Sequence, residues 1–106
     1  MDSQKYQMLL ISIPKNQSTQ MADLLVKSNL AACVSIMPTV KSIYLWQGQI
    51  HKDAESLLII KSTSDKYAQL ESLILKHHPY DVPEIIAFDI TNGHKNYLNW
   101  ISETLT

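Results

Sequence analysis

The chain opens on a short apolar run and then changes to helical spacing. Met8 to Ile13 is almost wholly apolar and stops at Pro14, a pattern typical of a strand that is buried on both faces. Apolar and small residues then recur every three or four positions, at Met21, Leu24, Leu25 and Ser28. This spacing predicts an amphipathic helix that ends at Asn29 in a left-handed turn. Its first turn can be capped by Asn16, Ser18 or Thr19.

A long hairpin should follow, because apolar and polar positions alternate with a period of two after Leu30. The alternation runs through Val34, Ile36, Val40, Ser42, Tyr44 and Trp46. Pro38 interrupts the ladder and predicts a bend, and Gln47-Gly48 supplies the turn. Residues 49–62 return with Leu57 to Ile60 as their buried centre. The outer end of this hairpin is longer than the sheet of a small domain needs, so we expect it to project beyond the rest of the domain.

A second helix and a last strand complete the pattern. Ser64 or Asp65 can cap the helix, and Pro79 prevents its continuation. One side of this helix carries Tyr67, Leu70, Leu73, Ile74 and His77. Residues 84–90 then predict a strand, and Asn92-Gly93 turns the chain into a terminal helix. The apolar face of that helix comprises Tyr97, Trp100, Ile101 and Thr104.

The order of these elements predicts the fold class. A strand, a helix, two strands, a helix, a strand and one additional helix make a ferredoxin-like βαββαβ arrangement in an α+β protein. Both main helices then cover one face of an antiparallel sheet. The other face needs a partner.

Composition limits the classes of partner and the number of domains. The 106 residues are 45% hydrophobic and 18% charged, which predicts one folded domain over 1–106. Nine lysines, no arginine and ten acids leave a net charge of −1, which argues against nucleic acid as a partner. No apolar stretch approaches the roughly 20 residues of a membrane span. The single cysteine, Cys33, and the non-secretory pattern of residues 1–4 favour the cytoplasm.

The densest cluster of polar side chains lies in residues 76–84. His78 and Glu84 could meet across the turn between helix and strand and hold copper or zinc. His77 lies in the last turn of the predicted helix. As an alternative to metal binding, its side chain could there donate a hydrogen bond to a backbone carbonyl that has no partner within the helix. Cys33 is a soft metal ligand, a redox-sensitive thiol or a small buried hydrophobe. Tyr44, Trp46 and Trp100 could line a pocket or belong to the core or an interface.

The sequence lacks the short motifs that are most typical of enzymes. It has no glycine-rich phosphate loop, no serine elbow and no His-Glu-x-x-His pattern. An enzyme would have to use His78 as a base with Glu84 or Asp81 as the orienting carboxylate. No nucleophile or oxyanion donor can be assigned to accompany them.

Four blocks of sequence are distinctive: Leu30-Ala31-Ala32-Cys33-Val34, residues 42–50 (SIYLWQGQI), residues 78–85 (HPYDVPEI) and residues 97–101 (YLNWI). In their order and spacing these blocks resemble the CutA family of divalent-cation tolerance proteins. The resemblance implies a trimer similar to the PII signalling proteins, in which the long hairpins pair between subunits. It also implies tolerance to divalent metals, copper above all.

The resemblance also carries residues over by position. His77 and His78 correspond to the family's copper-site histidines, and Cys33 matches the cysteine of the Leu-Ala-Ala-Cys block. Some bacterial members place a further copper-binding cysteine in the first strand, where this chain has Ile11. Loss of that sulfur disfavours Cu(I) and leaves imidazole binding of Cu(II) or Zn(II).

The sequence and the resemblance together give two candidate functions of different classes. The first is a non-enzymatic cytoplasmic homotrimer that binds divalent copper or zinc through His78 and His77. The second is a PII-like module that binds a small molecule in clefts between subunits. Aromatic walls and a polar contact for those clefts would come from Trp46, Trp100, Tyr80 and Glu84.

Overall fold

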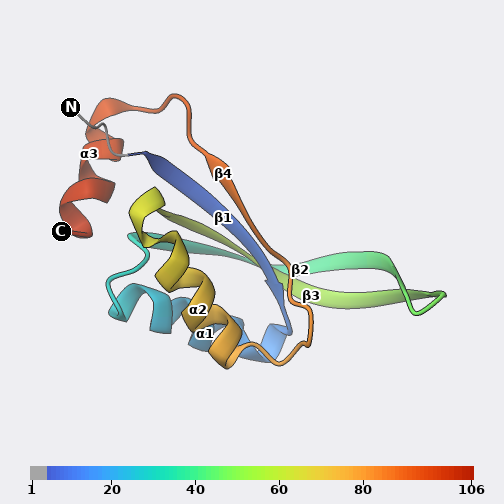
Figure 1. Ribbon diagram of the computed structural model, residues 1–106. Coiled ribbons are helices and arrows are strands. Elements are labelled where there is room, and N and C mark those ends of the chain that lie inside the picture. The colour runs from blue at the N-terminus through green and yellow to red at the C-terminus, as the bar shows by residue number, and fades with distance from the viewer. Residues whose placement is uncertain (1–4) are drawn as a thin grey trace.

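The computed structural model describes residues 5–106 and has the expected α+β architecture (Figure 1). The strands are β1 (Tyr6–Ile13), β2 (Cys33–Trp46), β3 (Gln49–Thr63) and β4 (Ile85–Asp89), and the α-helices are α1 (Ser18–Lys27), α2 (Tyr67–His77) and α3 (Lys95–Thr104). The predicted order of elements is therefore confirmed. The amino-terminal pattern that argued against secretion, residues 1–4, lies outside the described residues.

The four strands form one antiparallel sheet in the order β2-β3-β1-β4. Helices α1 and α2 both cover the same face of this sheet (Figure 1). Side chains alternate along a strand, so every second residue of β1 points toward the helices. The main core between sheet and helices consists of Leu9, Ile11, Ile13, Met21, Leu25, Ala31, Leu58, Ile60, Leu70 and Ile74.

The long hairpin of β2 and β3 extends beyond the helix-covered part of the sheet (Figure 1), as the sequence predicts. Its register shifts between Met37 and Val40, around Pro38, whose carbonyl accepts a 2.8 Å bond from the Ser56 hydroxyl. The turn at the tip is formed by Gln47 and Gly48 with φ angles of 51° and 76°. Glycine adopts that left-handed geometry without a steric penalty.

The predicted helix caps were wrong. Short 3-10 turns, Lys15–Gln17 and Ser64–Lys66, lead into α1 and α2, and neither helix has a side-chain cap. The hydroxyl of Ser18 instead donates backward to the Lys15 carbonyl at 3.0 Å. The tighter turn already bonds the first free backbone groups, so capping side chains are dispensable. Asn29 does take the left-handed conformation expected of it, with φ 60°.

The face of the sheet opposite α1 and α2 remains largely uncovered in one chain. We call it the open face and define it by the apolar residues Met8, Leu10, Leu57, Ile59, Ile86 and Phe88. Ile86 and Phe88 are 44% and 46% exposed, although they lie in a strand. Helix α3 packs at one end of the sheet, where Ile101 and Leu105 are buried. A contiguous apolar surface of this kind marks an interaction site.

Candidate functional site

A pocket of about 360 Å³ lies at the base of the long hairpin. It is lined by Ser12, Ser42, Ile43, Tyr44, Glu55, Tyr80, Val82 and Glu84. We call it the hairpin-base pocket. Tyr80 and Glu84, two of the residues expected at a ligand site, are therefore brought together. The residues come from β1, both hairpin strands and the segment before β4, so the pocket exists only in the folded chain.

The centre of this pocket is a buried carboxylate. Glu55 is only 5% exposed, and its Oε2 accepts a 2.7 Å hydrogen bond from the Tyr80 hydroxyl. Burial, followed by the neighbouring Glu55 carboxylate, holds the pKa of Tyr80 well above its ordinary value of 10.0. Tyr80 therefore stays a neutral donor at physiological pH, which is how a buried acceptor is satisfied.

His78 connects the pocket to the central strand. It is 8% exposed; its Nε2 lies 2.8 Å from the Ser12 carbonyl oxygen, and its Nδ1 accepts the Tyr80 backbone N–H at 3.2 Å. Because a carbonyl only accepts, the proton of the neutral ring belongs on Nε2. Both ring nitrogens are thus used within the chain, and a metal ion could bind His78 only by displacing one of these bonds.

The two adjacent histidines lie in different environments. Helix α2 ends at His77, and His78 is extended (φ −82°, ψ 137°), the conformation favoured before a proline. His77 is exposed and lines a small cavity of about 110 Å³ together with Met21 and Gln17. Its ring has no hydrogen-bond partner among residues 5–106. Of the two imidazoles, His77 is the one open to an incoming metal.

Residues 5–106 of a single chain contain no complete metal site. Over the described range 5–106, no three His, Cys, Asp or Glu side chains come close enough together to hold an ion. Cys33, semi-exposed, lies in β2 beside Lys61 of β3, on the same side of the sheet as the open face. That places its thiol across the sheet from the helices that carry His77.

Two expected pocket residues lie elsewhere in this chain. Trp46 ends β2 at the hairpin tip, and Trp100 lies on α3, stacked on Tyr97 with ring centroids 5.6 Å apart. Both are about two-fifths exposed. Neither lines the hairpin-base pocket formed by one chain, so they could wall it only if a second subunit contributed them.

Sequence reasoning missed Glu55 and Ser12 as pocket residues, whereas Tyr44 was among the aromatic residues expected to be able to line a pocket and does line this one. Glu55 shares the two-residue period of Leu57 and Ile59, so a carboxylate occupies an otherwise apolar row of β3. A glutamate at a position where the pattern calls for an apolar residue was therefore the sequence feature that could have indicated a buried acid. Ser12 offers its hydroxyl to Glu84 at 3.4 Å, and Tyr44 donates to Asp53, whose carboxylate raises the pKa of Tyr44.

The hairpin-base pocket is suited to binding. It offers two carboxylates and two phenols, which can take up a cation or the N–H and O–H donors of a polar molecule. The phenol of Tyr80 is held neutral by its burial and its bond to Glu55.

The family model of the CutA1 divalent ion tolerance protein matches residues 7–104. This chain belongs to the CutA1 family. The divalent-cation tolerance protein CutA of Thermus thermophilus is 41% identical over 98 residues, which cover 92% of this chain and 95% of that protein. The resemblance seen in the four sequence blocks is thereby confirmed.

Solved CutA structures share the fold of this chain. CutA1 from Oryza sativa has a TM-score of 0.93 at 35% identity, covering 96% of this chain and 94% of its own. A CutA from Nostoc, described as a PII-like protein in apo form, has a TM-score of 0.89 at 27% identity over 94% of this chain and 97% of its own. Within residues 5–106, no helix is both long and apolar enough to cross a membrane.

Proposed function

We propose that the protein is a non-enzymatic, cytoplasmic homotrimer that contributes to divalent-cation tolerance by binding Cu(II) or Zn(II) weakly. The observation that carries the proposal is the match to the divalent ion tolerance family over residues 7–104. The unpaired thiol of Cys33 agrees with a reducing compartment.

The open face supports the assembly. Apolar side chains on β4 are more than two-fifths exposed there, and the hairpin beyond it exposes Leu45 and Ile50 to about 70%. A stable monomer rarely presents so large a contiguous apolar surface. Covering it with identical chains gives a closed assembly of the kind that most soluble oligomers adopt.

The metal-binding part rests on His77. A free imidazole is a common ligand for copper and zinc, and His77 provides one at the end of α2, where it lines the same small cavity as Met21. His78 would add a second imidazole only after giving up its bond to the Tyr80 N–H. With so few ligands in one chain, binding should be weak and should favour Cu(II) over the alkaline-earth ions.

Calorimetric titration with Cu(II) and Zn(II) tests this assignment. His77→Ala should weaken binding by about tenfold or more, whereas His94→Ala, which removes another exposed imidazole at the start of α3, should leave it unchanged. His78→Ala should change affinity less than His77→Ala. Equal binding by wild type and His77→Ala would contradict the assignment.

A second candidate function is the binding of a small molecule in the hairpin-base pocket. It is favoured by the pocket's position on the same side of the sheet as the open face, where a neighbouring subunit could close it. The ligand should carry cationic or donor groups that complement Glu55 and Glu84. Glu84 is exposed and makes only a long 3.4 Å contact, so it is free to reorient.

A thermal-shift screen of cationic and polyhydroxylated metabolites tests this candidate. A ligand that raises the melting temperature of wild type and His77→Ala, but not that of Glu84→Gln, would support it. Absence of any shift across the screen would count against it and leave the metal proposal untouched.

A further inference from the structure

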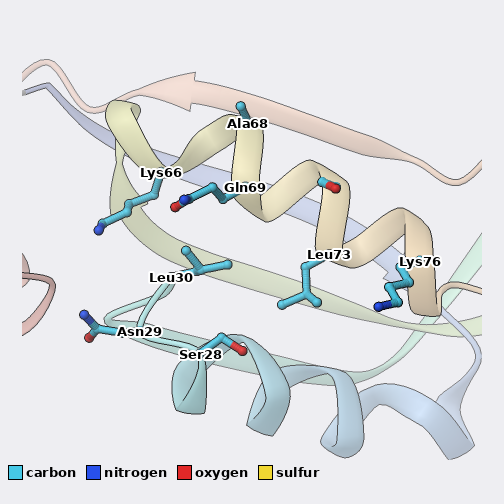
Figure 2. A pocket seen from close by; sticks show the side chains of 9 residues that line it. Ser28, Asn29, Leu30, Lys66, Ala68, Gln69, Leu73 and Lys76 are labelled. Carbon is cyan, nitrogen blue, oxygen red and sulfur yellow. The ribbon is translucent and has the colours of Figure 1, made fainter.

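A larger groove lies on the helical side of the protein, away from the open face. It runs between the end of α1 and the length of α2, with a volume of about 700 Å³ (Figure 2). We call it the helix groove and define it by Leu30, Lys66, Gln69, Ser72, Leu73 and Lys76. Its volume falls within the range of small-molecule pockets, roughly 300–1,000 Å³.

The floor of the groove follows from how α1 ends. Asn29 takes a left-handed conformation, which turns the chain so that Leu30 lies beneath α2. Leu30 is then fixed by its backbone, since its N–H donates to Leu25 and its carbonyl accepts a 2.6 Å bond from Ser62. Figure 2 shows Leu30 and Leu73 pointing into the space between the two helices. Both are half-buried and form an apolar floor.

The wall of the groove is a stripe of side chains that begins at Lys66, the last residue of the 3-10 turn, and continues along α2. Lys66, Gln69, Leu73 and Lys76 are spaced by three, four and three residues, which places them on one helical face. A lysine therefore stands at each end of the stripe, with an apolar residue and an amide between. Ten residues at 1.5 Å per residue separate the two lysines by roughly 15 Å along the helix.

The charge of the groove is uncompensated. No acidic side chain lines it, and within the described part of the chain neither Lys66 nor Lys76 has a salt-bridge partner. The nearby Lys27 is neutralised by Asp23 at 2.7 Å. In a protein whose net charge is −1, this is a local concentration of positive charge around an apolar floor.

We propose that the helix groove binds an elongated amphiphilic dianion. An acid group at each end pairs with Lys66 and Lys76, the apolar middle covers Leu30 and Leu73, and Gln69 and Ser72 offer polar contacts along one side. Because α1 and α2 lie on the opposite side of the sheet from the open face, the site stays accessible when that face is covered (Figure 1). It needs neither a bound metal nor the hairpin-base pocket.

Titration of the assembled protein with dodecanedioate, followed by TROSY NMR, tests the proposal. This probe has two carboxylates, an apolar middle and a length comparable to the spacing of the lysines. We expect saturable shifts of backbone signals at Leu30, Gln69 and Leu73. Dodecanoate should bind more weakly, and dodecane-1,12-diol should bind weakest, because each lost carboxylate removes one ion pair.

The variant Lys66→Gln/Lys76→Gln should weaken binding of dodecanedioate by about two- to thirtyfold, which corresponds to the loss of two exposed ion pairs worth about 0.2–1 kcal/mol each. Lys15→Gln/Lys95→Gln removes the same charge from two exposed sites elsewhere and should bind as wild type does. Equal affinity of both double variants, equal affinity for the diol, or shifts confined to the open face would overturn the proposal.

Discussion

Ile86→Lys is expected to abolish assembly of the protein. Ile86 lies in β4 beside Leu10 of β1, which in turn pairs with Ile59 of β3, so these three side chains form a row across the open face. In one chain Ile86 is 44% exposed, and a lysine could be tolerated there. In an assembly that buries this row, each copy would place an unpaired ammonium in an apolar interface, which is strongly unfavourable.

The expected loss is large because the substitution is repeated in every subunit. Burying one isoleucine side chain contributes about 1.5–3 kcal/mol, and the lysine adds a desolvation penalty. Leu75→Lys is the matched control, since Leu75 is 50% exposed on α2 and faces away from the sheet. Light scattering should give a reduced mass or unfolded protein for Ile86→Lys and an unchanged mass for Leu75→Lys. Unchanged mass for both would contradict burial of the open face.

His78→Ala should destabilise the folded protein by about 2–4 kcal/mol. The substitution removes a buried ring, leaves the Ser12 carbonyl without its donor, and leaves the Tyr80 N–H without its acceptor. Buried groups that lose their partners each cost about 1–3 kcal/mol, partly offset here because the new cavity can admit water. The Tyr80 ring also loses its contact with the imidazole, whose centroid lies 4.8 Å away.

Chemical denaturation at one fixed protein concentration measures this effect, because stability of an oligomer depends on concentration. His94→Ala is the control, since His94 is exposed and should change stability by less than about 0.5 kcal/mol. His78→Gln, which keeps a donor and an acceptor, should recover part of the loss. If His78→Ala proved as stable as His94→Ala, the structural role assigned to His78 would be wrong.

The strands and helices could be predicted because local rules determine them. The two-residue period marked β2 and β3, Pro38 marked the break in register, and Gln47-Gly48 marked the turn. Asn29 was identified as the left-handed residue that ends α1. In each case the deciding interaction is between residues close in sequence, so the pattern alone carries the information.

The arrangement of side chains at the site could be predicted only in part. Tyr80 and Glu84 were expected together because they are neighbours in sequence, but the partner of Tyr80 is Glu55, which is 25 residues away. Their meeting depends on how β3 and β4 both pair with β1, because Ser56 lies opposite Ile13 and Ile85 lies opposite Ile11. Likewise, His77 and His78 diverge because the helix stops between them, and the partners of His78 come from β1 and from Tyr80. Long-range register of this kind is not encoded in local spacing.

The prediction of capping side chains for α1 and α2 was wrong for a related reason. Ser18, Ser64 and Asp65 have the side chains that capping requires, but the chain enters both helices through a 3-10 turn. Whether such a turn forms depends on the direction in which the chain leaves the preceding strand. Before α2, the hydroxyl of Thr63 donates to the carboxylate of Asp65, so the expected capping carboxylate is already engaged within the 3-10 turn that precedes the helix.

Multi-angle light scattering of the unmodified protein across a dilution series tests the central claim, that several copies of this chain complete one another's open sheet face. We expect a single species of three chains, each 12.1 kDa, that persists on dilution until unfolding begins. A folded monomer that remains soluble with its open face exposed would contradict the account.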